Sequence, residues 1–300
     1  MRTATVFAPG HLTGLFQICD QSINPLEKGA RGSGISIELG TTTRVVSKPA
    51  RKMDCNIFIN GRLADDAIVS ENVVSHYMGQ LDHPVSLNIA HKIETPIMAG
   101  FGSSGGGALS LSLALNHVLE TGYDRVEAAQ VAHVAEIECK TGLGSVYAAE
   151  VGGFGVLTEA GAPGIGESVS YSGSGDLLVI YVYYGSIPTK EALSDPELRR
   201  RINQMGGNFV DELTRELTPE RFIRFSRQFT EHIGIVTPRL RRLFEHMDSE
   251  GYTFTMAMFG EVAFTVLPSE CLEDVLISLS SLRDSEPVVT RIDEKGTRFV

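Results

Sequence analysis

The sequence predicts an α+β fold arranged in two lobes. In the first half, segments in which apolar and polar residues alternate are separated by segments of helical period. The second half combines further strand patterns with a mostly helical region at 188–250. Between the halves lies a glycine- and serine-rich stretch, 161–175, of the kind that joins domains. We therefore expect an N-terminal lobe over residues 1–165 and a C-terminal lobe over residues 166–300.

The first half of the chain is predicted to alternate strands and helices. The first strand is expected to end at Pro9-Gly10, because this pair is a turn signal. Asn60-Gly61 predicts a hairpin, since both residues adopt positive φ readily. Asp124 is a suitable N-cap for a helix. Strands are expected over 3–8, 35–46, 55–59 and 85–93, and helices over 64–78, 108–119 and 124–139.

The second half carries three prolines that each mark the start of a helix. Pro196, Pro219 and Pro238 suit the first helical turn, because the N–H that proline lacks would have no partner there. The remaining pattern predicts strands over 177–183, 252–258, 262–267 and 288–292, and a helix over 269–282.

Charge and cysteine content limit the classes of function. The formal net charge of -11 argues against nucleic acid as a partner, because that ligand needs a basic surface. A small anionic ligand remains compatible, since backbone N–H groups and a metal ion can hold it. The four cysteines show no metal-ligand spacing, and no window approaches eighteen uninterrupted apolar residues. We therefore expect a cytoplasmic protein that does not bind membranes.

A glycine- and serine-rich loop at 100–107 precedes a strongly apolar segment. Glycine lets the backbone approach a phosphate closely, and the first turn of the following helix leaves N–H groups without partners. Serine hydroxyls can donate to phosphate oxygens or bind Mg²⁺. The loop is therefore predicted to hold the triphosphate of ATP. The residues assigned to it, with the preceding proline, are Pro96, Gly100, Gly102, Ser103, Ser104, Gly105, Gly106 and Gly107.

Other interpretations of this loop remain open. It could be a flexible connection or a site of close helix packing. The Walker pattern is absent, because Cys139 and not glycine precedes Lys140-Thr141. Residues 100–105 satisfy G-x-G-x-x-G, which would predict NAD(H) binding by a Rossmann oxidoreductase. That motif should directly follow a strand, whereas the strand here ends near Ile93.

Residues 96–104, Pro-Ile-Met-Ala-Gly-Phe-Gly-Ser-Ser, resemble the P-x-x-x-G-L-G-S-S signature of the GHMP kinases, the superfamily of galactokinase, homoserine kinase and mevalonate kinase. Residues 8–11 resemble the N-terminal segment of that superfamily, and residues 255–261 lie where its C-terminal glycine motif belongs. The resemblance implies an N-terminal lobe with a left-handed βαβ unit, a ferredoxin-like C-terminal lobe and a site between them. It also implies a homodimer, which no sequence feature supports by itself.

Four segments are similar to the archaeal pantoate kinase branch of this superfamily. They are residues 9–16, 29–34, 141–144 and 258–264. This similarity implies ATP and Mg²⁺ as cofactors and pantoate, a small hydroxy acid, as the substrate in coenzyme A biosynthesis. Homoserine, mevalonate or shikimate are alternative acceptors within the superfamily.

The resemblance also assigns the metal and catalytic residues. Glu136 matches the helix glutamate that binds magnesium in the family, and Ser104 matches its serine partner. Glu138 is two residues on, so it faces away from any metal that Glu136 binds. Many relatives carry an aspartate as general base where this chain has Ser145. Three explanations stay open: no protein base is needed, Ser145 positions the acceptor hydroxyl, or the protein only binds nucleotide.

Five residues are assigned to the acceptor substrate. The guanidinium of Arg31 suits a carboxylate, because its donors are fixed and bidentate. An exposed structural arginine is the alternative. His11 is expected to donate to substrate or phosphate, and a structural histidine is again the alternative. Ser33, Thr141 and Gly142 lie in the segments shared with the pantoate kinases.

Overall fold

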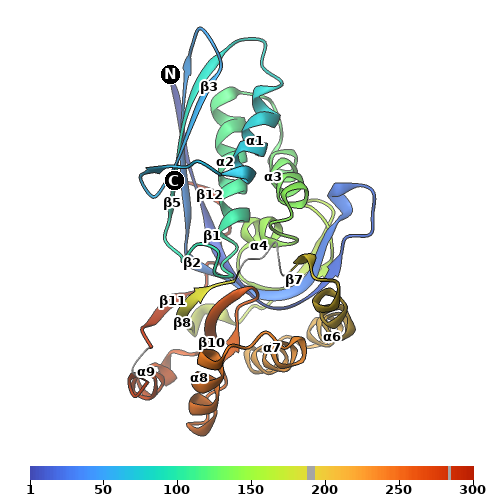
Figure 1. Cartoon of the computed structure of the whole chain (residues 1–300), viewed down its shortest axis with the longest axis vertical. Helices are drawn as coiled ribbons and strands as arrows, with labels where there is room; N and C mark the ends of the chain where they lie inside the picture. The colour runs from blue at the N-terminus through green and yellow to red at the C-terminus, as the bar shows by residue number, and fades with distance from the viewer. Residues whose placement is uncertain (188–192, 283–284) are drawn as a thin grey trace.

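The computed structural model describes residues 1–187, 193–282 and 285–300. The start of the predicted helical region, residues 188–192, therefore lies outside the described residues. The described chain forms two sheets with helices packed on them, which confirms the α+β prediction (Figure 1). No helix within the described ranges is long and apolar enough to cross a membrane.

The first sheet and its helices form the upper part of Figure 1. The sheet has the strand order β12-β1-β2-β5-β3-β4, and β6 joins β2 and carries β7. Strand β3 pairs in parallel with β5, and α1 connects them, so the three form a βαβ unit. The predicted left hand of that unit stays a prediction. The strands are β1 (Arg2–Cys19), β2 (Gly29–Pro49), β3 (Asp54–Ile59), β4 (Arg62–Leu63), β5 (Val85–Ile93), β6 (Phe154–Glu159), β7 (Glu167–Ser170) and β12 (Arg298–Phe299).

Four helices cover one face of this sheet, and η1, a short 3-10 turn (Pro25–Glu27), lies between β1 and β2. Helix α3 begins as predicted, because Asp124 and Glu127 cap it reciprocally. The helices are α1 (Ile68–Met78), α2 (Ser103–Leu119), α3 (Arg125–Cys139) and α4 (Ser145–Val151).

Strand β1 does not end at Pro9-Gly10, so that prediction was wrong. The strand continues to Cys19, and the register with β2 shifts between these two residues. A bulge tolerates a proline, which has no N–H to donate. Gly10 is needed there, because a Cβ at this position would lie 2.8 Å from the carbonyl oxygen of Leu39. The continuation carries β1 and β2 down to the second sheet (Figure 1).

The second sheet has the strand order β11-β8-β10-β9, with every pair antiparallel. Its element order, one strand, helices, two strands, a helix and a last strand, is ferredoxin-like. The elements are β8 (Leu177–Ser186), α6 (Pro196–Arg215), α7 (Pro219–Ile233), α8 (Pro238–Ser249), β9 (Thr255–Met256), β10 (Gly260–Pro268), α9 (Leu272–Ser280) and β11 (Pro287–Arg291), with short 3-10 turns η2 (Ser174–Asp176) and η3 (Ser269–Cys271).

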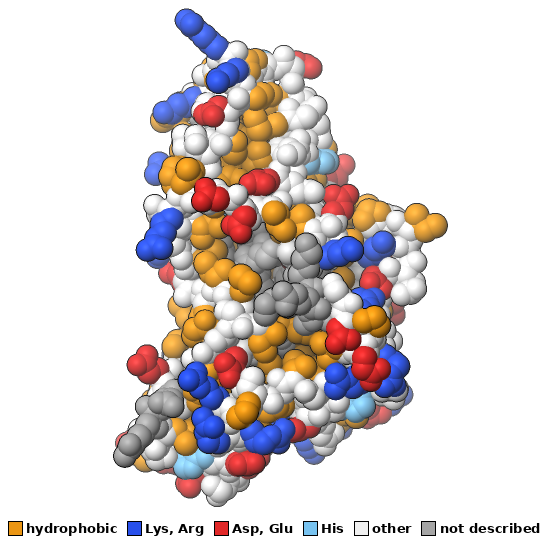
Figure 2. Space-filling view, viewed as in Figure 1, with side chains coloured by type: hydrophobic (Ala, Val, Ile, Leu, Met, Phe, Trp, Pro, Cys, Tyr) orange, Lys and Arg blue, Asp and Glu red, His pale blue; other side chains and the backbone are white. Residues whose placement is uncertain are grey.

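The three proline-initiated helices are confirmed. Each has its proline in the first turn, and the residue before it caps the helix with a side-chain oxygen. Their apolar sides face the sheet, while Arg and Glu side chains alternate on the outer surface (Figure 2). The capping residues are Asp195, Thr218 and Thr237.

The lower parts of β1 and β2 share a hydrophobic core with the second sheet, and a separate core lies between the upper part of the first sheet and its helices. Phe16, at the lower end of β1, packs edge-on against Phe229 of α7 and Phe259 before β10, with ring centroids 6.0 and 5.7 Å apart. Strands β7 and β12 both pair with the first sheet, although they follow residue 166. The division of the chain at residues 165 and 166 stays a prediction.

Candidate active site

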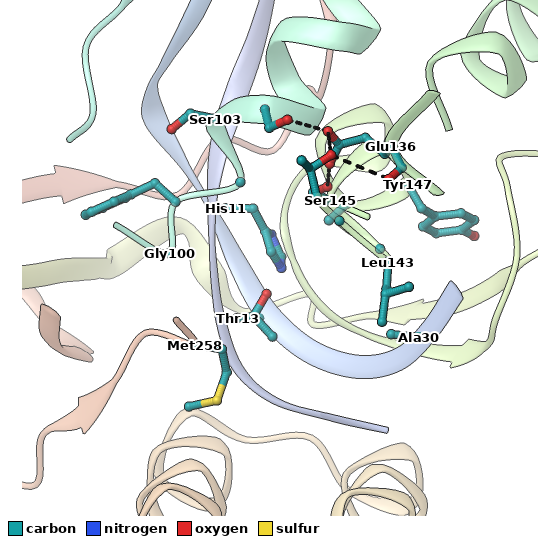
Figure 3. Close-up of a pocket in the computed structure, with 18 of the residues that line it drawn as sticks. His11, Thr13, Ala30, Gly100, Ser103, Glu136, Leu143, Ser145, Tyr147 and Met258 are labelled. Carbon is teal, nitrogen blue, oxygen red and sulfur yellow. Dashed lines mark hydrogen bonds between the residues drawn. The ribbon is translucent and has the colours of Figure 1, made fainter. Parts of the chain in front are cut away.

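A cavity of about 560 Å³ lies where the two sheets meet the glycine loop. It is lined by β1 and β2, by the loop before α2, by Glu136 of α3, by the turn before α4, and by Met258 and Phe259 ahead of β10. Figure 3 shows side chains from these elements converging on one space. The cavity therefore joins segments that are up to about 250 residues apart in sequence.

The glycine loop forms an uncapped helix start. Gly100 and Gly102 have φ values of +80° and +63°, which favour glycine. Helix α2 begins at Ser103, and Gly102, its N-cap, has no side chain to bond the first N–H groups. Ser103 and Ser104, the first two residues of the helix, line the cavity, and the positive end of the helix dipole lies behind their N–H groups. The loop thus has the features of an anion site.

Helix α2 begins five residues earlier than the predicted start at residue 108. Its first turn contains Gly105 and Gly106, and the apolar pattern begins only after them. A Cβ on Gly105 would overlap Ser145 Oγ, and one on Gly106 would lie 3.6 Å from Ala8 Cβ. The glycines therefore let α2 approach α4 and β1. Close helix packing, one alternative for this loop, is present together with the anion-site geometry.

Glu136 lies at the centre of a cluster of hydroxyl groups (Figure 3). Ser104 and Thr141 donate hydrogen bonds to Oε1, the latter at 2.8 Å, and Ser145 donates to Oε2 at 3.1 Å. Glu136 is only 2% exposed. Burial raises its pKa, and the three hydroxyl hydrogen bonds partly offset that rise. The structure thus brings together four residues that the sequence had assigned to the site.

The turn after α3 fixes this cluster. Lys140 ends the helix with a left-handed conformation, and the Thr141 N–H then bonds the Glu136 carbonyl oxygen at 3.1 Å. Gly142 follows, and a Cβ on it would overlap the Glu136 carboxylate. Glu138 points elsewhere, because it accepts a hydrogen bond from Asn72 at 3.1 Å. Only one of the two glutamates therefore faces the cavity.

His11 also faces the cavity, from β1 (Figure 3). Its Nδ1 lies 3.1 Å from Ser36 Oγ, and its backbone N–H donates to the Phe101 carbonyl oxygen at 2.8 Å. Burial lowers the pKa of the imidazole to about 4, so the ring is neutral near pH 7. Ser33 lines the same region, and its hydroxyl donates to the Gly155 carbonyl oxygen.

Arg31 is placed outside the cavity lining. Its guanidinium donates to Thr158 O at 2.6 Å, to Gln17 at 3.2 Å and to Asp211 of α6 at 2.5 Å. Each of the three guanidinium nitrogens thus already has a partner within the protein. The structure therefore does not bring Arg31 to the other site residues. Pro96, Gly105 and Gly106 also lie outside the lining, behind the loop that they shape.

Several lining residues were not assigned from the sequence. Thr13 and Met258 lie in segments that resemble the pantoate kinases, but neither type of side chain by itself indicates a site. Tyr147 and Ser168 form one wall and are 3.3 Å apart. Ser168 belongs to β7, within the stretch interpreted as a domain junction. The glycines and serines of that stretch give no strand pattern, so β7 was not predicted.

The sequence of this chain is similar to that of known proteins. The family model for the GHMP kinases N terminal domain matches residues 67–153. A pantoate kinase of Methanocaldococcus jannaschii is 31% identical over 96% of this chain and 99% of that protein. A pantoate kinase of Thermococcus kodakarensis is 28% identical over 92% of this chain and 91% of that protein.

Solved structures agree with these matches. A phosphotransferase related to the CoA biosynthesis pathway has a TM-score of 0.90 at 26% identity, covering 100% of this chain and 99% of that one. Mevalonate diphosphate decarboxylase of Staphylococcus aureus has a TM-score of 0.77 at 15% identity, covering 100% and 98%, which shows a shared fold. The sequence matches and the two-lobed structure together show that the chain belongs to the GHMP kinase superfamily, alongside the pantoate kinases.

Proposed function

We propose that this chain is an ATP-dependent kinase that phosphorylates the hydroxyl group of pantoate, giving 4-phosphopantoate for coenzyme A biosynthesis. The observation that carries the proposal is the position of the Glu136 cluster against the uncapped start of α2. The pantoate kinases that match nearly the whole chain supply the substrate.

The triphosphate of ATP would lie at the start of α2, where backbone N–H groups and the hydroxyls of Ser103 and Ser104 face the cavity. Phosphoryl transfer depends mainly on positioning and charge neutralisation, and such a loop provides both. The nucleoside would extend toward the start of α1. There Ile68 and Ile93 line the cavity and offer an apolar surface for the base.

The Glu136 cluster fits a magnesium ion. Mg²⁺ prefers oxygen ligands and binds through one or two carboxylates together with substrate phosphates. Glu136 is a buried carboxylate, and the described residues lining the cavity include no Lys or Arg to neutralise it. We propose Glu136 and Ser104 as the ligands. A bound Mg²⁺ would supply neutralisation of the β- and γ-phosphate charge.

The acceptor would bind on the opposite side of the glycine loop. His11, Thr13 and Ser33 line this part of the cavity with polar groups, and Met258 and Leu143 add apolar surface (Figure 3). This mixture suits a small hydroxy acid with a branched carbon skeleton. Because Arg31 is engaged elsewhere and the Ser33 hydroxyl donates to Gly155, the Thr13 hydroxyl would donate to the substrate carboxylate.

The proposal is tested by measuring ADP release with ATP, Mg²⁺ and each of four acceptors: pantoate, homoserine, mevalonate and shikimate. Phosphorus NMR of the product identifies the phosphorylated oxygen. We expect turnover with pantoate and at most traces with the others. Turnover confined to another acceptor would contradict the substrate while keeping the kinase.

A nucleotide-binding protein without activity is the second candidate, and Ser145 favours it, because no carboxylate stands at that position. Calorimetry with ATP and Mg²⁺ separates the two. Binding of ATP without turnover on any of the four acceptors would support this second candidate.

A further inference from the structure

His11 lies beside the glycine loop and close to Ser145. A Cβ built on Gly102 would lie 3.7 Å from the Cβ of His11 and 3.5 Å from the Cβ of Ser145. The two side chains therefore flank the same point at the start of α2. A Cβ on Gly34 would overlap His11 Nε2, so Gly34 leaves room for the edge of the ring. The Cβ of His11 thus lies at the loop proposed to hold the γ-phosphate, and the ring extends from there toward Gly34 and Thr13, on the side proposed for the acceptor (Figure 3).

The hydrogen bonds around Ser36 favour Nδ1 as the ring nitrogen of His11 that carries the proton. Ser36 Oγ lies 3.3 Å from the Ala148 carbonyl oxygen, which can only accept. If the single hydroxyl proton of Ser36 is donated there, Ser36 Oγ must accept from His11 Nδ1, at 3.1 Å. The neutral ring then carries its proton on Nδ1, and Nε2 is left with a lone pair.

This lone pair is free to accept a proton. Among the described residues Nε2 has no hydrogen-bond partner, and it is not one of the fully buried unpaired atoms. Of the other titratable groups in the cavity lining, Glu136 accepts three hydroxyl hydrogen bonds, both ring nitrogens of His91 are bonded, and the Tyr147 hydroxyl donates to Ser168. Asp66 lies just before α1, at the end of the cavity proposed for the nucleoside. His11 therefore differs from the donor that the sequence suggested, because its free nitrogen is an acceptor.

We propose that His11 Nε2 is the general base that takes the proton of the acceptor hydroxyl, in place of the carboxylate that Ser145 does not provide. This inference rests on the proposed kinase function. As the hydroxyl oxygen bonds to the γ-phosphorus, the bond from that phosphorus to the ADP oxygen breaks. The hydroxyl proton moves to Nε2, and the resulting imidazolium later releases it to water. The loose transition state makes a weak base sufficient, because the hydroxyl becomes acidic only as the new bond forms.

The first test replaces His11 with asparagine. In His11→Asn the side-chain amide can still donate to Ser36, but no atom stands at the Nε2 position. We expect kcat to fall about 100-fold, the usual scale for general-base catalysis, while KM for ATP and pantoate changes less than about threefold. His117→Asn is the matched control, because His117 is exposed on α2 away from the cavity. An unchanged kcat, or a rise in KM alone, would overturn the proposal.

Chemical rescue distinguishes a base from a structural residue. In His11→Ala, added imidazole should raise kcat at least about fivefold, because it can occupy the vacated space and accept the proton. Imidazole should leave the rate of His117→Ala unchanged. Absence of rescue in a variant that is folded by circular dichroism and binds ATP would count against the proposal.

The protonated nitrogen can be measured independently of turnover. Nitrogen-15 NMR of histidine-labelled protein at pH 7 should show the Nδ1–H tautomer for His11, and the Nε2–H tautomer would overturn the inference. Failure of the proposed function would give a different result, because the wild-type protein would then show no turnover with any of the four acceptors. If the wild type prefers another acceptor, the His11 variants are assayed with that acceptor.

Discussion

At the residue scale, the buried carboxylate of Glu136 is the group on which we expect the proposed phosphoryl transfer to depend most. Glu136→Gln keeps the shape of the side chain and removes its charge. We expect kcat to fall by about 100-fold or more and the Mg²⁺ concentration needed for half-maximal rate to rise, because charge stabilisation at the transferring phosphate is a large catalytic effect. Steady-state rates across a Mg²⁺ titration measure both.

Glu138→Gln is the matched control for this substitution. It removes the same charge two residues away, from a side chain that bonds Asn72 outside the cavity. Its rate and Mg²⁺ dependence should match those of the wild type. If Glu136→Gln behaved in the same way, Glu136 would not be a metal ligand.

Gly142 provides a second test at this scale, based on space and not on charge. In Gly142→Ala the new methyl group would overlap the Glu136 carboxylate, so the carboxylate must move. We expect at least a tenfold loss of kcat/KM, since small misplacements of a reacting group are costly. In the control Gly144→Ala the methyl group meets Leu157 at an ordinary 3.6 Å, and activity should persist. Equal activity of the two variants would show that the cluster tolerates displacement.

At the element scale, a chain of hydrogen bonds joins α1 and α2, which both line the end of the cavity proposed for the nucleotide. His91 of β5 contacts Ser70 of α1 at 3.2 Å through Nε2 and Thr43 of β2 at 2.8 Å through Nδ1. Thr43 in turn contacts Ser110 of α2 at 2.6 Å. His91 is 4% exposed. The first turn of α1 and the helix after the glycine loop are thereby linked through one imidazole.

This link predicts how stability depends on pH. Burial lowers the pKa of His91 to about 4, below the unfolded value of 6.5. Between these pH values the unfolded chain binds a proton that the folded chain does not. The contribution of His91 to the free energy of unfolding is therefore fully present above about pH 6.5 and is lost toward pH 4. The loss reaches about 3 kcal/mol for this one group. Urea unfolding at several pH values measures it.

His11 has a pKa lowered to a similar value, and that of His133 is lowered too, so they add to the same slope. His91→Gln should therefore be less stable than the wild type at pH 7, yet lose less stability between pH 6.5 and 4. A slope identical to that of the wild type would mean that His91 is already charged in the folded protein.

Elements with strong local signals were predictable from the sequence, and those that depend on tertiary contacts were not. Asn60-Gly61 and the capped, proline-initiated helices carry their signals within a few residues, and the structure contains them. Pro9-Gly10 carries an equally strong turn signal, yet β1 continues through it, because pairing with β2 resumes after a bulge. Strand β12 has two residues, which are too few to show a periodic pattern. It forms because its backbone pairs with the edge of β1.

The same distinction applies to the site. Ser104, Glu136 and Ser145 were assigned because short motifs carry their family resemblance, and the structure places them in hydrogen-bond contact. Arg31 was assigned from its chemistry and its glycine neighbours. Its actual partners, Thr158 and Asp211, are more than 120 residues away along the chain, so no local pattern could reveal them.

At the scale of the whole molecule, Arg31 connects the two lobes. It lies on β2, and its partner Asp211 lies on α6. In Arg31→Gln we expect a loss of about 0.2–1 kcal/mol of stability, the range for a partly exposed ion pair, and KM for pantoate within about threefold of the wild type. Asp211→Asn should give the same small loss. A rise in KM above about thirtyfold in Arg31→Gln alone would restore the substrate role expected from the sequence.

The shared core around Phe16 leads to a prediction for the whole molecule, because we expect it to make the two lobes unfold as one cooperative unit. Phe16 on β1 contacts Phe229 of the second lobe and Phe259 at the cavity wall. We expect urea to unfold peptides of both lobes at one midpoint, measured by hydrogen exchange and mass spectrometry. Phe16→Ala should lower that midpoint for both, by about 3–5 kcal/mol in stability. Phe299→Ala, at a side chain that is 49% exposed, should cost little. Separate midpoints would mean that the lobes fold independently and that the cavity between them can open without unfolding either one.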